Sequence, residues 1–465
     1  MATLREHACC GEAEDAGADD DRAHRGSMPA SRRTAGAWQT PAVRRLLVPL
    51  AVAGVFALAS PASADLHVGL MDPAYQGDMP RSFFRDLGLL QPQVLRYDLY
   101  WNQVAPSQPA NARDFKDPAY RWRDFDVAML EEAAAGFEGR VVVTVWRTPA
   151  WAFAPGATGT AYSNAPDAQA YRDFVYAAAQ RYAGGDDPDG EGGLDPLPRI
   201  DHWEIWNEPN FYGALRPQKD ATTGQPLSPG IFTTLLNDAY DEIHAVGEEH
   251  GFDPVVISGG LYRAKSTRGV NPIRFLEEIA ALGARFDALG FHPYPTVPSL
   301  GLDDGATGGT VYPSISVGNF DRLVADVERI WPGEDFPIWL TEFGWQSNPV
   351  PGADQYAVGE AEQAEFLAGA IDRFSSFPRV EALIWFLIRD EPPDPRGVRD
   401  TWQSGLRRMD GTYKPSWDTW RELVGDGGPD GLDPLDLFPS DGAILSAQQA
   451  RTQIEIITRA AVAVG

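Results

Sequence analysis

The chain is almost free of cysteine. Among its 465 residues only Cys9 and Cys10 carry a thiol, and both stand near the amino-terminal end. The rest of the sequence therefore excludes disulfide bonds, a cysteine nucleophile and a metal site built on thiolates. A protein without disulfides must be held together by an apolar core, and a segment of about 400 residues is long enough to bury a large one.

Histidine is also scarce, and its spacing excludes the common metal-binding motifs. Five histidines follow residue 64: His67, His202, His244, His250 and His292. They form no H-x-H or H-E-x-x-H pattern, which a metal-dependent hydrolase would need, and no serine nucleophile elbow is present. The acidic loop 184–193 lacks the spacing and final glutamate of an EF-hand, so we interpret it as a solvated turn. We expect no metal and no cofactor.

Basic residues are outnumbered by acidic ones. The chain has 39 Lys and Arg against 66 Asp and Glu, a formal net charge of −27 at pH 7. Such a surface repels phosphate backbones, so we expect no nucleic-acid partner. The acidic balance otherwise indicates solubility and says nothing about a substrate.

Long apolar runs are limited to one segment, residues 46–59. It follows Arg44 and Arg45 and precedes the small-residue sequence Ala-Ser-Ala at 62–64. Its length falls short of the ~20 residues of a membrane span, and the whole pattern is typical of a secretory signal peptide. We therefore predict cleavage after Ala64 and export of the protein, with a retained membrane anchor as the alternative. Met28 is an alternative start that would give a signal peptide of ordinary length.

What the sequence does contain, between residues 65 and 424, is an alternation of short apolar runs and amphipathic stretches. Eight runs are predicted strands: 66–71, 94–99, 141–146, 202–207, 255–260, 287–292, 337–342 and 382–387. Predicted helices lie between them, at 122–130, 167–183, 231–249, 272–282, 320–330 and 355–374. Eight such units predict an α/β fold, a (β/α)₈ TIM barrel. The alternative is an open doubly wound sheet, but the segment 67–73 is not the Gly-rich turn that such a sheet normally carries.

The segments outside the barrel are short. Residues 1–64 form the predicted leader, and the glycine-rich stretch 425–431 begins a tail, 425–465, that we interpret as an appendage with one helical face. The tail is too short for a second catalytic domain. Three tryptophans, Trp402, Trp417 and Trp420, are expected to pack the last helix of the barrel.

Two glutamates, Glu208 and Glu342, each stand at the end of a predicted strand and just before Pro or before Phe-Gly. In a barrel of parallel strands, the carboxyl ends of the strands carry the catalytic groups. A lone glutamate there would be expected to form an ion pair or to cap a loop. Two of them, both in tryptophan-rich segments, instead favour the pair of carboxylates that cleaves a glycosidic bond.

The sequences around these glutamates resemble those of the clan A glycoside hydrolases, retaining enzymes built on (β/α)₈ barrels. The motif Trp-Asn-Glu-Pro at 206–209 is similar to the acid/base site of the clan, and Thr-Glu-Phe-Gly at 341–344 to its nucleophile site. The longer segment 203–210 is most similar to glycoside hydrolase family 39, with family 5 close behind. The resemblance implies that Glu208 is the acid/base and Glu342 the nucleophile.

The resemblance also implies roles for other residues. Asn207 would bind the 2-hydroxyl of the sugar, and Arg96 would stand beside the nucleophile and keep it ionised. His292 and Tyr294 match the polar pair near the nucleophile, and Trp385 matches the aromatic floor of the sugar subsite. The sequence departs from family 5 after the third strand, where that family often has histidine and this chain reads Trp-Arg-Thr-Pro at 146–149.

Several of these residues also have structural interpretations. Arg96 could instead pair with Glu204 inside the barrel. Strict alternation along a strand puts Glu204 and Glu208 on one face and turns Asn207 away, so Asn207 joins the site only if the strand loses its regularity. Trp345, at a strand end, is expected to contact a sugar because carbohydrate rings stack on flat aromatic side chains.

The sequence thus predicts a secreted retaining glycoside hydrolase that acts on an oligosaccharide or polysaccharide through a covalent intermediate. The alternative is a carbohydrate-binding barrel without catalysis. The sequence does not predict which sugar or linkage is cleaved, or an oligomeric state.

Overall fold

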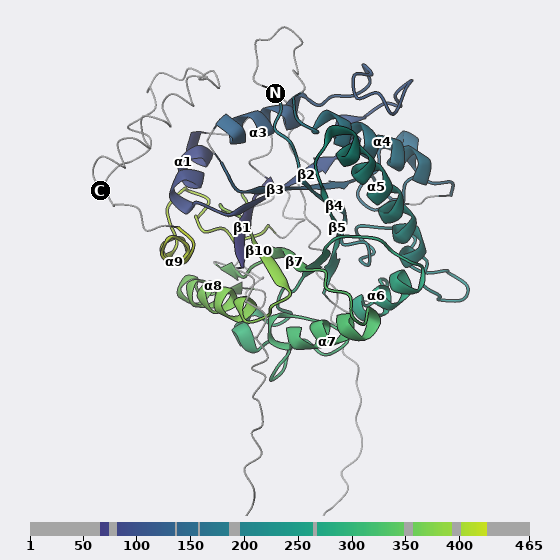
Figure 1. The fold of residues 1–465 in the computed structure, drawn as a ribbon. Helices are drawn as coiled ribbons and strands as arrows, with labels where there is room; N and C mark the ends of the chain where they lie inside the picture. Colours follow the sequence, from purple (N-terminus) through teal and green to yellow (C-terminus); the bar gives the residue numbers. More distant parts are fainter. Residues whose placement is uncertain are drawn as a thin grey trace, which may run out of the picture. The chain divides into compact units, whose positions relative to one another are not determined.

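Eight parallel strands close a barrel in the order β1-β10-β7-β6-β5-β4-β3-β2 (Figure 1). The structure is a computed structural model that describes residues 66–73, 81–134, 137–156, 159–185, 196–263, 267–347, 357–392 and 401–425. The barrel strands are β1 (His67–Met71), β2 (Val94–Tyr100), β3 (Arg140–Trp146), β4 (His202–Asn207), β5 (Val255–Tyr262), β6 (Leu289–His292), β7 (Ile338–Phe343) and β10 (Val380–Phe386). Each overlaps one of the eight predicted strands, so the predicted (β/α)₈ barrel is confirmed.

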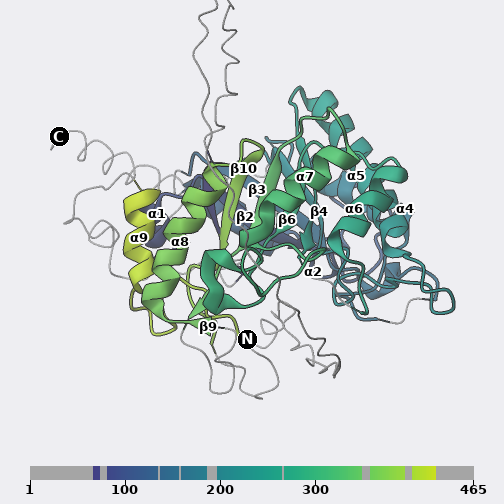
Figure 2. The same ribbon diagram turned by 90° about the horizontal axis from the view of Figure 1, so that it is seen from below.

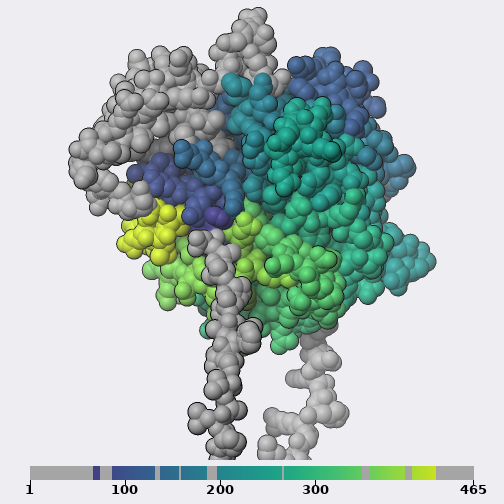
Figure 3. Space-filling model, viewed as in Figure 1, coloured from purple at the N-terminus to yellow at the C-terminus, as the bar shows by residue number. Residues whose placement is uncertain are grey.

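The barrel closes between its first and last strands. Residues His67 to Met71 of β1 pair in parallel with Ala382 to Phe386 of β10. In the space-filling view the purple and yellow-green parts of the chain accordingly lie side by side (Figure 3). A short two-stranded sheet, β8 (Gln346–Ser347) and β9 (Ala357–Val358), is inserted between β7 and β10.

Helices surround the strands (Figures 1 and 2). They are α1 (Arg81–Leu90), α2 (Trp101–Val104), α3 (Arg123–Ala134), α4 (Ala168–Arg181), α5 (Ser228–His250), α6 (Pro272–Ala281), α7 (Phe320–Ile330), α8 (Glu360–Ser375) and α9 (Pro415–Leu423), with 3₁₀ turns η2 (Ala150–Ala152), η3 (Pro298–Asp303) and η4 (Val317–Asn319). All six predicted helices are present, whereas α1, α2 and α9 lie outside the predicted ranges.

Local sequence signals set several helix ends. The side chain of Asp167 accepts a hydrogen bond from the Ala170 amide and so caps α4. Asn271 caps α6 in the same way, and Pro272 follows at the first helical position. Helix α5 ends at Gly251, whose φ of 76° is the left-handed conformation that glycine adopts without strain.

Two apolar layers result from the alternation of side chains along the strands. Inside the barrel, one buried cluster includes Val94, Val142, Ile257, Trp339 and Ile384. A second, larger cluster fills the space between the strands and the helices. Buried polar side chains also lie in the interior, among them Arg96 of β2, Glu204 of β4 and Glu342 of β7.

Some predictions concern residues outside the described ranges. The leader (1–64), most of the loop 184–193 and the tail beyond residue 425 lie there, so their interpretations stay predictions. Within the described ranges, no helix has the length and apolar character to cross a membrane.

Candidate active site

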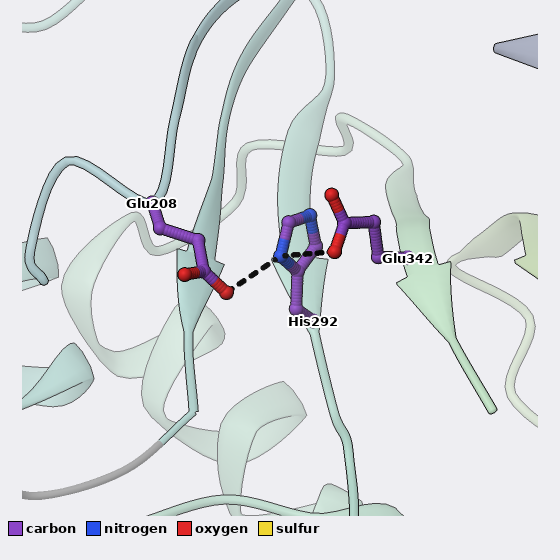
Figure 4. A group of neighbouring side chains, drawn as sticks. All are labelled: Glu208, His292 and Glu342. Carbon is purple, nitrogen blue, oxygen red and sulfur yellow. Dashed lines mark hydrogen bonds and ion pairs between the residues drawn. The ribbon is translucent and has the colours of Figure 1, made fainter. Parts of the chain in front are cut away.

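Glu208 directly follows strand β4, and Glu342 belongs to strand β7. Their side chains point toward each other, with the ring of His292 between them (Figure 4). One carboxylate oxygen of each glutamate and one ring nitrogen of His292 all lie within 4.8 Å of one another. Glu342 is 8 % exposed, and Glu208 is half-buried. The two predicted catalytic carboxylates therefore meet at one point.

A bulge in β7 brings Glu342 to the inside of the barrel. Leu340 pairs with Leu383, but the next pair joins Phe343 to Trp385, so β7 has one residue more than β10 over this stretch. Such an extra residue interrupts the alternation and re-aims a side chain. As a result Thr341 and Glu342, neighbours in sequence, both reach the interior.

Strand β4 is irregular at its end in a similar way. Trp206 and Glu208 both have positive φ, 69° and 45°, which is uncommon for residues other than glycine. Trp206 lies in the outer apolar cluster, while Asn207 turns inward, and its Oδ1 lies 3.0 Å from Arg96 Nη2. The condition set by the sequence for Asn207 to join the site, a loss of strand regularity, is therefore met.

Arg96 joins the polar groups of the site. Its Nη1 donates to Glu342 Oε1 at 2.8 Å, and its Nε donates to Glu204 Oε2 at 2.7 Å. The sequence left open whether Arg96 stands beside the nucleophile or pairs with Glu204, and the structure shows both contacts. Burial disfavours the charge of Arg96, but the carboxylates of Glu204 and Glu342 outweigh burial and raise its pKa above the ordinary value.

Glu204 is a fully buried carboxylate that organises this centre. Besides Arg96, the hydroxyls of Thr144 and Thr341 donate to it, each at 2.6 Å, and so does the Gly260 amide at 3.0 Å. A buried carboxylate needs such partners to offset its lost hydration. The two threonines were not predicted as site residues, because a threonine inside an apolar strand has no distinctive pattern.

The proton positions on His292 follow from its neighbours. The one hydroxyl proton of Thr341 goes to Glu204, so Thr341 accepts from Nε2–H of His292 at 3.1 Å. The other ring nitrogen, Nδ1, lies 3.1 Å from Glu208 Oε1 and 3.7 Å from Glu342 Oε2. Burial lowers the pKa of His292, but the two glutamates outweigh burial and the net shift is upward. Nδ1 of His292 and Oε1 of Glu208 therefore lie within hydrogen-bond distance of each other.

Gly260 makes the room that His292 occupies. A Cβ at this position would lie 2.1 Å from His292 Nε2 and 2.6 Å from Thr341 Oγ1. Only glycine fits there, and hydrophobic patterning alone did not single it out.

Tyr294 completes the surroundings of Glu342. Its hydroxyl donates to Glu342 Oε2 at 3.3 Å. Its ring lies 5.4 Å from that of Trp402, which also contacts Phe386 edge-on. Trp402 is only partly buried, and it lies beside the site instead of packing the last helix as predicted. Trp417 and Trp420, in contrast, are buried residues of α9.

Trp345 and Trp385 do not face the site. Both have 0 % exposure and lie in the outer cluster between the barrel and α8, where Trp345 contacts Phe366 and the two indoles lie 6.4 Å apart. The expected sugar contact is therefore corrected for both residues. The reason is that a position at a strand end does not determine whether the side chain points into the barrel or outward to the helices. Trp402, through its contact with Tyr294, is a tryptophan that the structure places beside the site.

The cluster of Glu208, His292 and Glu342 is compact enough to hold a metal ion. Arg96 already places a positive charge 2.8 Å from Glu342, however, and a cation beside it would be repelled. The donor set therefore fits a carboxylate pair better than a metal centre, and the expectation that the protein needs no metal stays a prediction.

Comparisons with known proteins agree with the fold. No family model matches the sequence, and no curated protein matches it. Among solved structures, the chain is similar to a family 39 glycoside hydrolase from Bacteroides cellulosilyticus WH2 (TM-score 0.52, 20 % identity, 78 % of this chain and 64 % of that one). It is also similar to the family 39 enzyme from Xanthomonas axonopodis pv. citri (0.51, 15 %, 78 % and 67 %) and to a monomeric β-xylosidase from Caulobacter crescentus CB15 (0.51, 17 %, 77 % and 67 %).

This chain spans less than two thirds of the Bacteroides enzyme and about two thirds of the other two. At these identities the likeness concerns the fold. The predicted resemblance to the clan A glycoside hydrolases, and within them most to family 39, is confirmed at that level: the chain has the barrel of these enzymes.

Proposed function

We propose that the protein is an exported glycoside hydrolase that cleaves its substrate with retention of configuration. The observation that carries the proposal is the pair of glutamates at the carboxyl ends of β4 and β7, with one oxygen of each within 4.8 Å of the other. Retaining enzymes hold their two carboxyl groups ~5–5.5 Å apart, whereas inverting enzymes separate them by ~6.5–9.5 Å to admit water. The short spacing supports double displacement.

The surroundings of the glutamates support different roles for them. Glu342 accepts hydrogen bonds from Arg96 and Tyr294, and these two donors hold its carboxylate in place, as a nucleophile requires. Glu208 faces His292, and its Oε1 lies 3.1 Å from Nδ1 of the ring, close enough for a proton to pass between them. Glu342 attacks the anomeric carbon while Glu208 gives its proton to the departing glycosidic oxygen. Water, deprotonated by Glu208, then releases the sugar from Glu342.

Kinetics of two variants on activated aryl glycosides test these roles. Glu342→Ala should abolish turnover of every substrate. Glu208→Gln should still form the glycosyl-enzyme with a good leaving group, because such a group needs little protonation, and should then stall at hydrolysis. Burst kinetics and intact-protein mass spectrometry detect the trapped intermediate. If Glu208→Gln blocks the first step as completely as Glu342→Ala does, the assignment of roles is wrong.

Further measurements separate the alternatives. Proton NMR of the first product distinguishes retention from inversion. An assay with and without a chelator tests the expectation that no metal takes part. Sugar binding without turnover by the intact chain would support a non-catalytic carbohydrate-binding barrel. We expect the protein from the culture medium to begin at Asp65, and amino-terminal sequencing that finds the leader still attached would contradict export by signal cleavage.

A further inference from the structure

Arg147 directly follows the last residue of β3, and it is 1 % exposed. Its guanidinium carbon lies 3.4 Å from the ring centre of Tyr100, 4.1 Å from that of Tyr162 and 4.6 Å from that of Trp146. Three aromatic rings thus surround one cation. Aromatic faces stabilise a guanidinium, but they accept none of its N–H groups in the plane.

The other buried arginines in the described ranges all bind carboxylates. Arg96 pairs with Glu204 and Glu342. Arg181 holds Asp126 through two hydrogen bonds, and Arg407 pairs with Asp86. Arg147 makes no ion pair and no side-chain hydrogen bond with the described residues, and its buried Nε has no partner. A buried charge without hydrogen bonds is costly, so a ligand is expected to supply the acceptors.

A carboxylate close enough to interact with Arg147, that of Asp98, already accepts hydrogen bonds from other donors. Asp98 accepts from the Tyr100 hydroxyl and from Trp146 Nε1, each at 2.9 Å. Burial raises the pKa of Asp98, and Arg96, Arg147 and Glu342 all act on its charge. Asp98 therefore lies within electrostatic reach of Glu342 and of Arg147, which places Arg147 on the β2–β3 side of the same site.

The backbone holds Arg147 in this position. Its φ of 70° is a strained conformation for a residue other than glycine and persists only where neighbours fix it. The Arg147 carbonyl accepts from the Asn102 amide at 2.9 Å, and Thr148 Oγ1 donates to the Asn164 carbonyl at 2.7 Å. The arginine is thus set in place before any ligand arrives.

We propose that Arg147 binds an anionic substituent of the sugar, a carboxylate or a sulfate ester, and that the substrate is therefore an acidic glycan. The planar fork of a guanidinium matches either group with two parallel hydrogen bonds. The inference rests on the proposed glycosidase function and adds the class of substrate to it.

Binding of matched oligosaccharides tests the inference. Isothermal titration calorimetry would compare β-1,4-tetraglucuronate with cellotetraose, β-1,4-tetramannuronate with mannotetraose, and a sulfated galactan tetrasaccharide with its desulfated form. The Glu342→Gln background prevents turnover. We expect at least one acidic member to bind roughly 10- to 100-fold more tightly than its neutral partner, the range for charge-assisted hydrogen bonds. The uronate and sulfate arms identify which anion is bound.

Variants then assign the preference to Arg147. Arg147→Met should remove it, and Arg147→Lys should keep part of it, because lysine retains the charge without the fork. The control is Arg113→Met, which removes an arginine that stacks 3.6 Å from the Tyr176 ring but, unlike Arg147, already pairs with Glu242. Equal binding of every acidic and neutral pair, or an unchanged preference in a folded Arg147→Met variant, would overturn the inference.

The two proposals fail in different ways. Turnover of neutral glycosides without any acidic preference would leave the glycosidase standing and remove the inference. An acidic preference that depends on Arg147, with no turnover of any glycoside by the intact chain, would leave the anion site standing and remove the glycosidase.

Discussion

At the scale of single residues, the sequence predicted the charged groups of the site better than the aromatic ones. Glu208 and Glu342 converge because interior side chains at the carboxyl ends of barrel strands point to the same axis, and Arg96 reaches Glu342 from within β2. Trp345 and Trp385 pack outward, because an indole at a strand end is equally suited to the core. Arg147 was not proposed as a site residue, since only the structure shows that it lacks an acceptor.

Gly260 gives the first prediction at this scale. In Gly260→Ala the new methyl group would overlap His292 and Thr341, so His292 must move away from Glu208. We expect kcat to fall by roughly 100-fold, because misplacing a catalytic group by about 1 Å costs that much, and the free energy of unfolding to fall by about 1–3 kcal/mol. Steady-state kinetics and chemical denaturation measure the two effects.

The control is Gly230→Ala in the first turn of α5, where the added methyl group meets nothing within 4 Å. This variant should be as active as the wild type and at most about 1 kcal/mol more stable. Full activity in Gly260→Ala would mean that the position of His292 does not matter for turnover.

At the scale of elements, strands were easier to predict than their irregularities. A buried parallel strand is a continuous apolar run, and all eight were recognised from that pattern. The bulge in β7 and the positive φ of Trp206 leave no trace in hydrophobicity, yet they decide which side chains enter the site. Helix α1 was not predicted, and the conformations of the long loops between strands and helices could not be predicted from the sequence.

The segment between β10 and α9 carries a pH-dependent prediction. Lys414 Nζ donates to Asp390 Oδ1 at 2.6 Å, and both side chains are buried. Burial raises the pKa of Asp390 to about 6, despite the opposing charge of Lys414. The folded state therefore binds more protons than the unfolded state between about pH 4 and pH 6, and the contribution of Asp390 to stability grows as the pH falls through that window.

Relative to Asp390→Asn, the wild type should gain roughly 1–3 kcal/mol of unfolding free energy between pH 7 and pH 4. Chemical denaturation of both proteins across that range measures the difference. Asp410→Asn is a control of opposite sign, because hydrogen bonds from Thr412 lower the pKa of Asp410. A difference that stays constant with pH would show that Asp390 is not protonated in the folded state near pH 4.

At the scale of the whole molecule, the alternation of strands and helices was sufficient to predict the barrel. Each strand buries its apolar surface only when helices cover it on the outside and other strands enclose it on the inside. Net charge was equally plain from the sequence, but its meaning for the substrate was not. The excess of acidic residues repels an anionic ligand, whereas the buried Arg147 attracts it. The two effects differ in range, because the repulsion comes from the whole surface and the attraction from one place inside the site.

These opposing effects predict an unusual salt dependence of the rate at which an acidic oligosaccharide binds. With a net charge of −27, the protein as a whole repels an acidic oligosaccharide at low ionic strength. Raising the salt from about 10 mM to about 150 mM shortens the screening length from ~30 Å to ~8 Å, which weakens this long-range repulsion. The contact with Arg147 is buried and screened far less. We therefore expect the association rate for the preferred acidic oligosaccharide to rise with salt, while its dissociation rate hardly changes.

Stopped-flow tryptophan fluorescence measures both rates, with the neutral partner oligosaccharide as the control whose association should not depend on salt. A steep loss of affinity with added salt would instead indicate that surface cations attract the ligand. That outcome would place the anion on the exterior of the protein. The buried guanidinium at the end of β3 would then have no part in recognising the substrate.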